Sequence, residues 1–175
     1  GAAGNAKLKD RDFVLDITSG TSTLPEGQSL SLAKGRFEAN DLLAKEVPGR
    51  FSFDIRGPLE NMLAFARQPD LNLVTKDVVE AQKLKGNGKA MIGLSLPLIK
   101  NVPKERVKVT TELSISDASM SNAMPGIDIT EGEFKVAMGP EQISVTGPAK
   151  LNGIASKLDW KKPRGSGAAT IEVET

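Results

Sequence analysis

Apolar and polar residues alternate along Arg106-Val107-Lys108-Val109-Thr110-Thr111-Glu112-Leu113-Ser114-Ile115-Ser116. The odd positions carry Val107, Val109, Leu113 and Ile115, whereas every even position is charged or hydroxylated. Successive side chains of a β-strand point to opposite faces of its sheet, so this segment predicts a strand with one apolar and one hydrated face. An antiparallel sheet that is covered on one side only has this pattern.

The same two-residue period recurs on both sides of this segment. The apolar sets with this spacing are Phe51, Phe53 and Ile55; Ile92, Leu94, Leu96 and Leu98; Phe134, Val136 and Met138; and Ile143 and Val145. Weaker strand candidates lie at 29–32, 37–39, 158–160 and 171–173. Hairpin turns are predicted where glycine separates the segments, at Gly126, Gly139-Pro140, Gly147-Pro148 and Gly153. The sequence therefore predicts a mostly β, antiparallel fold.

One or two short helices interrupt the predicted strands. The first is expected over about 58–67, because proline stands at the first helical position and an apolar i, i+3, i+4, i+7 pattern follows. The residues of that pattern are Leu59, Met62, Leu63 and Ala66. The second helix would run from Asp77, as its cap, to about Leu84.

Composition excludes several classes of function. The 175 residues include 23 Lys+Arg and 22 Asp+Glu, so there is no basic field for nucleic acid. His and Cys are both absent, which excludes Ser-His-Asp and Cys-His catalysis, zinc sites built on these ligands, and disulfides. Glu131 and Glu133 form the alternative, a carboxylate pair for glycoside hydrolysis, but glutamates at the rim of a turn are more common. We therefore expect no enzymatic activity, no metal and no cofactor.

The two ends of the chain differ from its middle. Residues 1–12 are polar and begin Gly1-Ala2-Ala3-Gly4, so they are predicted to be a frayed end or a cloning scar. A β-rich domain is expected over 13–160, and a basic, glycine-rich loop with a terminal strand over 161–175. No run of about 18 apolar residues and no signal-peptide pattern occurs, so any membrane anchor is expected outside this segment.

Five landmarks follow one another from Gly57 to Trp160. They are Gly57-Pro58-Leu59 opening a helix, a glycine-rich strand ending in Leu96-Pro97-Leu98, a charged turn into 103–116, the hairpin 126–134, and a strand pair over 147–160. This order resembles the AsmA-like family of bacterial envelope proteins, and within it the YhdP-like members.

The resemblance implies a periplasmic protein that is anchored in the inner membrane and built from repeated β-strands. Its sheet would be curved into a groove or a flattened half-barrel. Related bridge-like lipid transfer proteins carry phospholipid acyl chains in such grooves. The implied function is to bind or conduct lipid in support of outer-membrane lipid homeostasis, with phospholipid acyl chains and neighbouring repeats of the parent protein as partners.

The apolar strand positions are the candidates for contact with lipid. They are Phe51, Phe53, Ile55, Ile92, Leu94, Leu96, Val107, Val109, Leu113, Ile115, Phe134, Val136, Ile143 and Val145. The alternative is a structural or protein-interaction module, whose apolar faces form a closed core and leave no groove. Trp160 beside Lys161 and Lys162 is a pattern found at membrane interfaces, although a lone tryptophan more often packs at a sheet corner.

Overall fold

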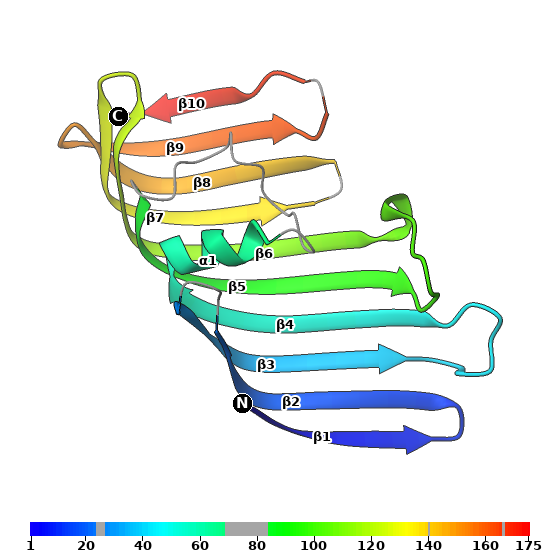
Figure 1. Ribbon diagram of the computed structural model, residues 1–175. Coiled ribbons are helices and arrows are strands. Elements are labelled where there is room, and N and C mark those ends of the chain that lie inside the picture. Colours follow the sequence, from blue (N-terminus) through cyan, green and yellow to red (C-terminus); the bar gives the residue numbers. More distant parts are fainter. Residues whose placement is uncertain (24–26, 69–83, 140, 166) are drawn as a thin grey trace.

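The computed structural model describes residues 1–23, 27–68, 84–139, 141–165 and 167–175. These residues form a ten-stranded antiparallel sheet in which every strand pairs with the next one along the chain (Figure 1). The strands are β1 (Ala2–Lys9), β2 (Asp12–Thr23), β3 (Ser29–Ala39), β4 (Pro48–Pro58), β5 (Leu84–Pro97), β6 (Lys108–Met124), β7 (Ile127–Met138), β8 (Gln142–Leu151), β9 (Ile154–Pro163) and β10 (Thr170–Glu174). The sheet is open, because β1 and β10 are not paired with each other within the described residues. The predicted antiparallel, mostly β fold is confirmed.

In the described part of the chain, two short helical segments accompany the sheet. Helix α1 (Leu59–Ala66) follows β4, and the 3-10 turn η2 (Lys104–Arg106) precedes β6. The first helix predicted from the sequence is therefore present. The second, over Asp77 to Leu84, lies outside the described residues except for Leu84, which begins β5.

Paired residues continue from strand to strand in rows across the sheet. One row crosses eight strands, β3 to β10: Leu32, Ile55, Ala90, Leu113, Val136, Val145, Trp160 and Ile171. A second row crosses five strands, β2 to β6: Leu15, Phe37, Phe51, Leu94 and Val109. Residues of the two rows lie four positions apart in β4, β5 and β6, so both rows are on the same face. In β3 they lie five positions apart, because the register shifts by one residue between Leu32 and Lys34. We call this the inner face.

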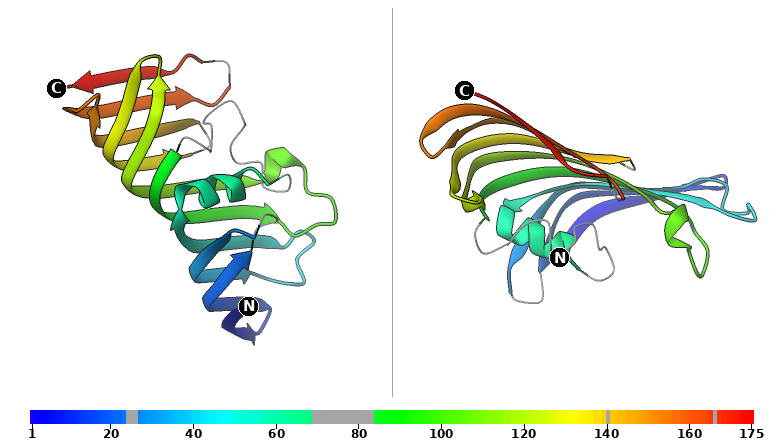
Figure 2. Two further views of the ribbon diagram at one scale, coloured as in Figure 1. Left: turned by 60° about the vertical axis from the view of Figure 1, so that its left-hand side comes forward. Right: turned by 90° about the horizontal axis from the view of Figure 1, so that it is seen from above.

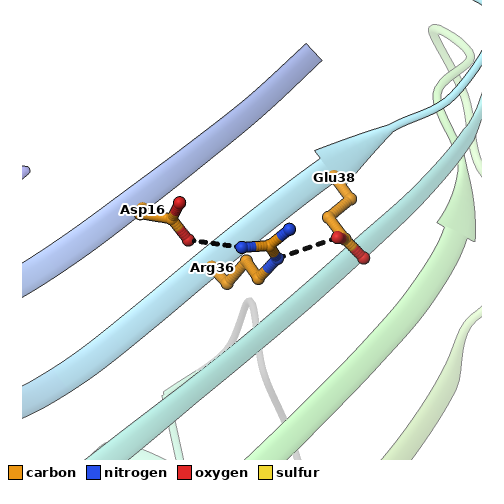
Figure 3. A network of polar contacts seen from close by, with 3 residues as sticks. All are labelled: Asp16, Arg36 and Glu38. Carbon is orange, nitrogen blue, oxygen red and sulfur yellow. Dashed lines mark hydrogen bonds and ion pairs between the residues drawn. The ribbon is translucent and has the colours of Figure 1, made fainter. Parts of the chain in front are cut away.

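The opposite, outer face is polar. Arg36 of β3 donates hydrogen bonds from Nη1 to Asp16 Oδ1 at 2.9 Å and from Nε to Glu38 Oε1 at 2.8 Å (Figure 3). The hydrogen bond to Glu38, followed by the charge of Asp16, raises the pKa of Arg36. All three side chains are partly exposed, so the network contributes little to stability and keeps this face hydrated.

Bulges bend the strands near α1. Asp117 and Asn122 in β6 and Glu131 in β7 have φ angles of +53°, +52° and +50°, and the β6–β7 register shifts over the same stretch. Hydrogen bonds hold two of them, because the Asp117 N–H donates to Glu133 Oε1 and the Asn122 N–H to Asp128 Oδ1. A bulge bends its strand and increases the local twist. The resulting sheet curls around the side that carries α1 (Figure 2).

The hairpin turn predicted at Gly147-Pro148 is wrong, because both residues lie inside β8. Gly147 has a φ of +152°, and a β-carbon there would collide with the backbone carbonyl oxygen of Glu133. The glycine is needed for the close approach of β8 to β7, and not for a change of chain direction. Gly126 and Gly153 do occupy turns, before β7 and before β9.

Both predicted chain ends need correction. Residues 1–12 were expected to be frayed, but Ala2–Lys9 forms β1, which pairs with β2 along its length. The segment lacks an apolar pattern because all residues of this edge strand are exposed. At the other end, the predicted loop starts too early, since Lys161, Lys162 and Pro163 belong to β9. This places the two lysines on opposite faces of the sheet.

Candidate functional site

Helix α1 packs on Gly88 of the inner face, whose strand partner Gly57 is covered by Leu30 of β3. Gly57 of β4 and Gly88 of β5 are paired neighbours. A β-carbon on Gly88 would overlap Met62 Sδ and would lie 3.0 Å from Leu59 Cδ2. Leu59 and Met62 are buried, and the Asn61 side-chain amide donates to the Ser29 carbonyl oxygen at 3.0 Å. The helix is thus fixed on the sheet by close packing and one polar contact.

A cavity of about 540 Å³ lies between α1 and the inner face of the sheet. This volume is within the range of about 300–1,000 Å³ that is typical of small-molecule sites. Its walls are mainly aliphatic and aromatic. The apolar lining residues from α1 are Leu59, Met62, Leu63, Phe65 and Ala66. Those from the strands are Ile55, Leu84, Ala90, Ile92, Leu113, Ile115, Ala118, Met120, Ile129, Phe134, Val136, Met138, Ile143, Val145, Leu158 and Trp160.

Few polar side chains reach this cavity. Among the described residues they are Thr111, Ser119, Lys162 and Arg164, and no carboxylate lines the wall. Thr111 is only 5% exposed, and its Oγ1 has no hydrogen-bond partner in the described part of the chain. A buried hydroxyl without a partner costs about 1–3 kcal/mol. The cavity is therefore suited to a ligand that is mostly hydrocarbon.

Lys161 and Lys162 have different surroundings. Lys161 is on the outer face, where its Nζ donates to Asp159 Oδ2 at 2.9 Å, and this hydrogen bond raises the pKa of Lys161. Lys162 is half-buried, pairs with Ile143 and lines the cavity. Neither Lys162 nor Arg164 has an ion pair with a described residue. Among the described lining residues, the positive charge is thus confined to the end of β9.

The structure brings most of the predicted lipid-facing residues together on the inner face. Eight of them line the cavity: Ile55, Ile92, Leu113, Ile115, Phe134, Val136, Ile143 and Val145. Five others lie on the inner face outside the cavity: Phe51, Phe53, Leu94, Leu96 and Val109. Val107 does not belong to a strand, since β6 begins at Lys108. The Phe51 ring stacks on that of Phe37, with centroids 4.4 Å apart.

Several cavity residues were missed by the sequence analysis. Ala118 and Ile129 are next to the bulges, where the two-residue spacing fails. Leu158 and Trp160 keep that spacing, so the weak strand signal at 158–160 could have identified them. Lys162 continues the same spacing, but it was not recognised because a loop was predicted from residue 161 onward.

The alternative carboxylate pair does not form a site. Glu131 Oε1 accepts a hydrogen bond from Lys150 Nζ at 2.7 Å, whereas Glu133 Oε1 accepts one from the Asp117 backbone. Glu133 thus supports a bulge, and Gly132 between the two glutamates is inside β7 instead of in the expected turn.

The described residues contain neither a cluster that could bind a metal ion nor a membrane-spanning helix. No group of three or more acidic residues in this part of the chain could hold a metal ion. None of its helices has the length and apolar character needed to cross a membrane. Comparison with known proteins found no matching family model, no matching curated protein and no matching solved structure.

Proposed function

We propose that this chain is a non-catalytic part of a bacterial cell-envelope protein, and that its inner face binds the hydrocarbon chain of a lipid. The observation that carries the proposal is the apolar row from Leu32 to Ile171, which continues across eight strands and lines the cavity on six of them, β4 to β9. The ligand would be a phospholipid acyl chain or a similar hydrocarbon. In this proposal the parent protein is AsmA-like and periplasmic, with its membrane anchor and neighbouring repeats outside this segment.

An apolar surface of this kind would lower the free-energy cost of moving an acyl chain through water. Each CH₂ group removed from water contributes about 0.8 kcal/mol, so an acyl chain of about 16 carbons that crosses water unprotected costs about 12 kcal/mol. Apolar attraction has no preferred direction, so a chain can move along a continuous row without meeting a deep energy minimum. The polar outer face keeps the protein hydrated meanwhile.

A structural or protein-interaction role is the second candidate. It is favoured by the two sheet edges, since β1 and β10 each leave one side without a strand partner in the described part of the chain. Ile171 and Val173 of β10 are 46% and 44% exposed. An exposed edge can pair with a neighbouring repeat. In this case the inner face would be covered by protein and would not take up lipid.

Trp160 provides a direct test, because it lines the cavity and is the only tryptophan of a chain without tyrosine. A stearic acid brominated on its hydrocarbon tail, kept below its micellar concentration, quenches an indole that it touches. We expect saturable quenching of Trp160, reversed by unbrominated stearic acid. Quenching that rises linearly without saturation, as for free indole, would overturn the proposal and favour the structural role.

Matched variants at neighbouring positions make the test specific. Leu113 lines the cavity, whereas Glu112 is exposed on the outer face. Leu113→Gln should weaken binding of the brominated acid by about tenfold, since a polar group would replace apolar contact. Glu112→Gln should leave binding unchanged. Circular dichroism of both variants checks that the sheet is intact.

A further inference from the structure

We infer that the cavity selects an amphiphile with an anionic headgroup, held at the end of β9 by Lys162 and Arg164. The hydrocarbon chain would extend from there across β8, β7 and β6 towards α1. This inference rests on the proposed function and specifies the ligand class of the same site. It is carried by the sign of the two cationic side chains, by their position, and by the lack of an ion pair between them and any described carboxylate.

The sign of the charge does not follow from composition. The whole chain has 23 basic and 22 acidic residues. The described cavity wall nevertheless contains two cationic side chains and no carboxylate. A surface whose charges serve only to keep it hydrated usually carries both acidic and basic side chains, as the outer face does with Asp16, Arg36 and Glu38. A wall of one sign attracts a ligand of the opposite sign.

Neither cation forms an ion pair with a carboxylate of the described residues. The other three basic residues of β8 and β9 are paired, since Lys150 contacts Glu131, Lys157 contacts Glu174 and Lys161 contacts Asp159. Lys162 is half-buried beside apolar side chains, yet no described carboxylate lies within ion-pair distance of it. An ammonium or guanidinium group gains most from an anion where water is partly excluded. A carboxylate or phosphate headgroup would supply that anion.

The position at one end of the apolar floor fits the shape of an amphiphile. Lys162 lies two residues beyond Trp160 and four beyond Leu158 on the same face of β9. At about 3.3 Å per residue, the Cα atom of Lys162 is about 13 Å from that of Leu158 along the strand. Trp160 lies between the apolar and charged ends, which suits an indole that is apolar in its body and polar at its N–H.

The backbone holds the second cation at the cavity mouth. The Arg164 N–H donates to the Glu141 carbonyl oxygen at 2.7 Å, which closes the end of β9 against the start of β8. Arg164 itself is exposed, so its guanidinium can meet a headgroup that remains in water. A guanidinium can bind carboxylate or phosphate through two parallel hydrogen bonds. One cation at the wall and one at the mouth thus fit a headgroup at the water boundary.

The test compares ligands of equal chain length and different headgroups at pH 8, by displacement of the brominated stearic acid from Trp160. The ligands are stearic acid, a stearoyl lysophosphatidic acid and the neutral monostearoylglycerol, with inorganic phosphate as the headgroup alone. We expect both anionic amphiphiles to bind at least about tenfold more tightly than the neutral one at low salt. This preference should shrink as salt is added, and inorganic phosphate should not displace the acid.

Variants separate the headgroup site from the hydrocarbon site. Lys162→Gln/Arg164→Gln should remove the preference for anionic ligands, so that they bind no more tightly than monostearoylglycerol. Lys161→Gln, which removes a neighbouring charge from the outer face, should keep the preference. Equal binding of neutral and anionic ligands to the unaltered protein would overturn this inference and leave the proposed function standing. Failure of all amphiphiles to bind would overturn the proposed function itself, and displacement by inorganic phosphate would indicate a phosphate site instead.

Discussion

Met62 of α1 lies directly over Gly88 of β5, so closely that a β-carbon on Gly88 would overlap the Met62 sulfur atom. Met62 also lines the cavity. The position of the cavity wall formed by α1 therefore depends on the absence of a side chain at one point of the sheet. Gly57, the strand partner of Gly88, extends this side-chain-free area towards Leu30.

Substitution of Gly88 by alanine should destabilise the fold. The new methyl group would force Met62 and Leu59 away from β5, and such overpacking costs about 1–3 kcal/mol. Urea denaturation followed by circular dichroism would measure the loss. Gly139→Ala is the matched control, because a β-carbon there meets no atom closer than 3.9 Å, and its stability should change by less than about 0.5 kcal/mol.

The pair can be tested by a double-mutant cycle. Met62→Ala removes buried apolar contact and should cost about 2–5 kcal/mol by itself. It also makes space for the new methyl group, so the double variant Gly88→Ala/Met62→Ala should be more stable than the sum of the single effects by at least about 0.5 kcal/mol. Additive effects would show that Met62 does not pack on Gly88.

The alternation in 107–115 was enough to predict the sheet and its apolar face, because it is a local property of one strand. Bulges, in contrast, depend on contacts between strands. Asp117 and Glu131 interrupt the alternation, and their hydrogen-bond and ion-pair partners, Glu133 and Lys150, are residues that strand pairing brings near them. β1 could not be recognised because an exposed edge strand is held by backbone hydrogen bonds, which any sequence can make.

The cavity was harder to predict than the sheet. Its apolar strand residues followed from their two-residue spacing, but its second wall depends on where α1 lies. That placement depends on Gly88, a residue that the alternation does not distinguish from other positions of its strand. Lys162 was lost for another reason, since Lys-Lys-Pro-Arg-Gly has the composition of a loop, whereas pairing with β8 keeps its first three residues in β9.

Thr111→Val should stabilise the protein in the absence of ligand. The Thr111 hydroxyl is buried without a partner among the described residues, and its removal should gain about 1–2 kcal/mol. Urea denaturation measures the change. Thr110→Val is the control on the exposed, outer face, where the effect should be within about 0.5 kcal/mol of zero. If Thr111→Val instead lowers the free energy of unfolding by as much as the removal of a buried hydrogen bond does, the hydroxyl must have a partner.

An ion pair in the loop before β4 should make the free energy of unfolding depend on pH in the acidic range. Arg106 donates from Nη1 and Nη2 to the two oxygens of Glu46, at 3.1 and 2.6 Å. These hydrogen bonds, followed by the charge of Arg106, lower the pKa of Glu46 below its usual 4.5. Because the folded state has the lower pKa, the contribution is complete above about pH 4.5 and is lost as the pH falls through the folded-state value.

Glu46→Gln should therefore lower stability slightly at pH 7 and hardly at all at pH 3. The measurement is urea denaturation at a series of pH values, with Glu105→Gln as a control that removes another carboxylate near Arg106. An equal effect of Glu46→Gln at both pH values would mean that the ion pair does not form in solution. High salt should reduce the effect at pH 7, since both side chains are exposed.

Photo-crosslinking in cells distinguishes an inner face that contacts lipid from one covered by protein. A photoreactive amino acid would replace either Leu113, which lines the cavity, or its neighbour Glu112, which is exposed on the outer face. We expect lipid adducts, identified by mass spectrometry, at position 113 and not at 112, because adjacent strand residues point to opposite faces. Protein adducts at position 113 would favour the structural role, since a covering chain would then exclude lipid. Equal lipid labelling at both positions would mean that the membrane is close to both faces, and the inner face would lose its special role.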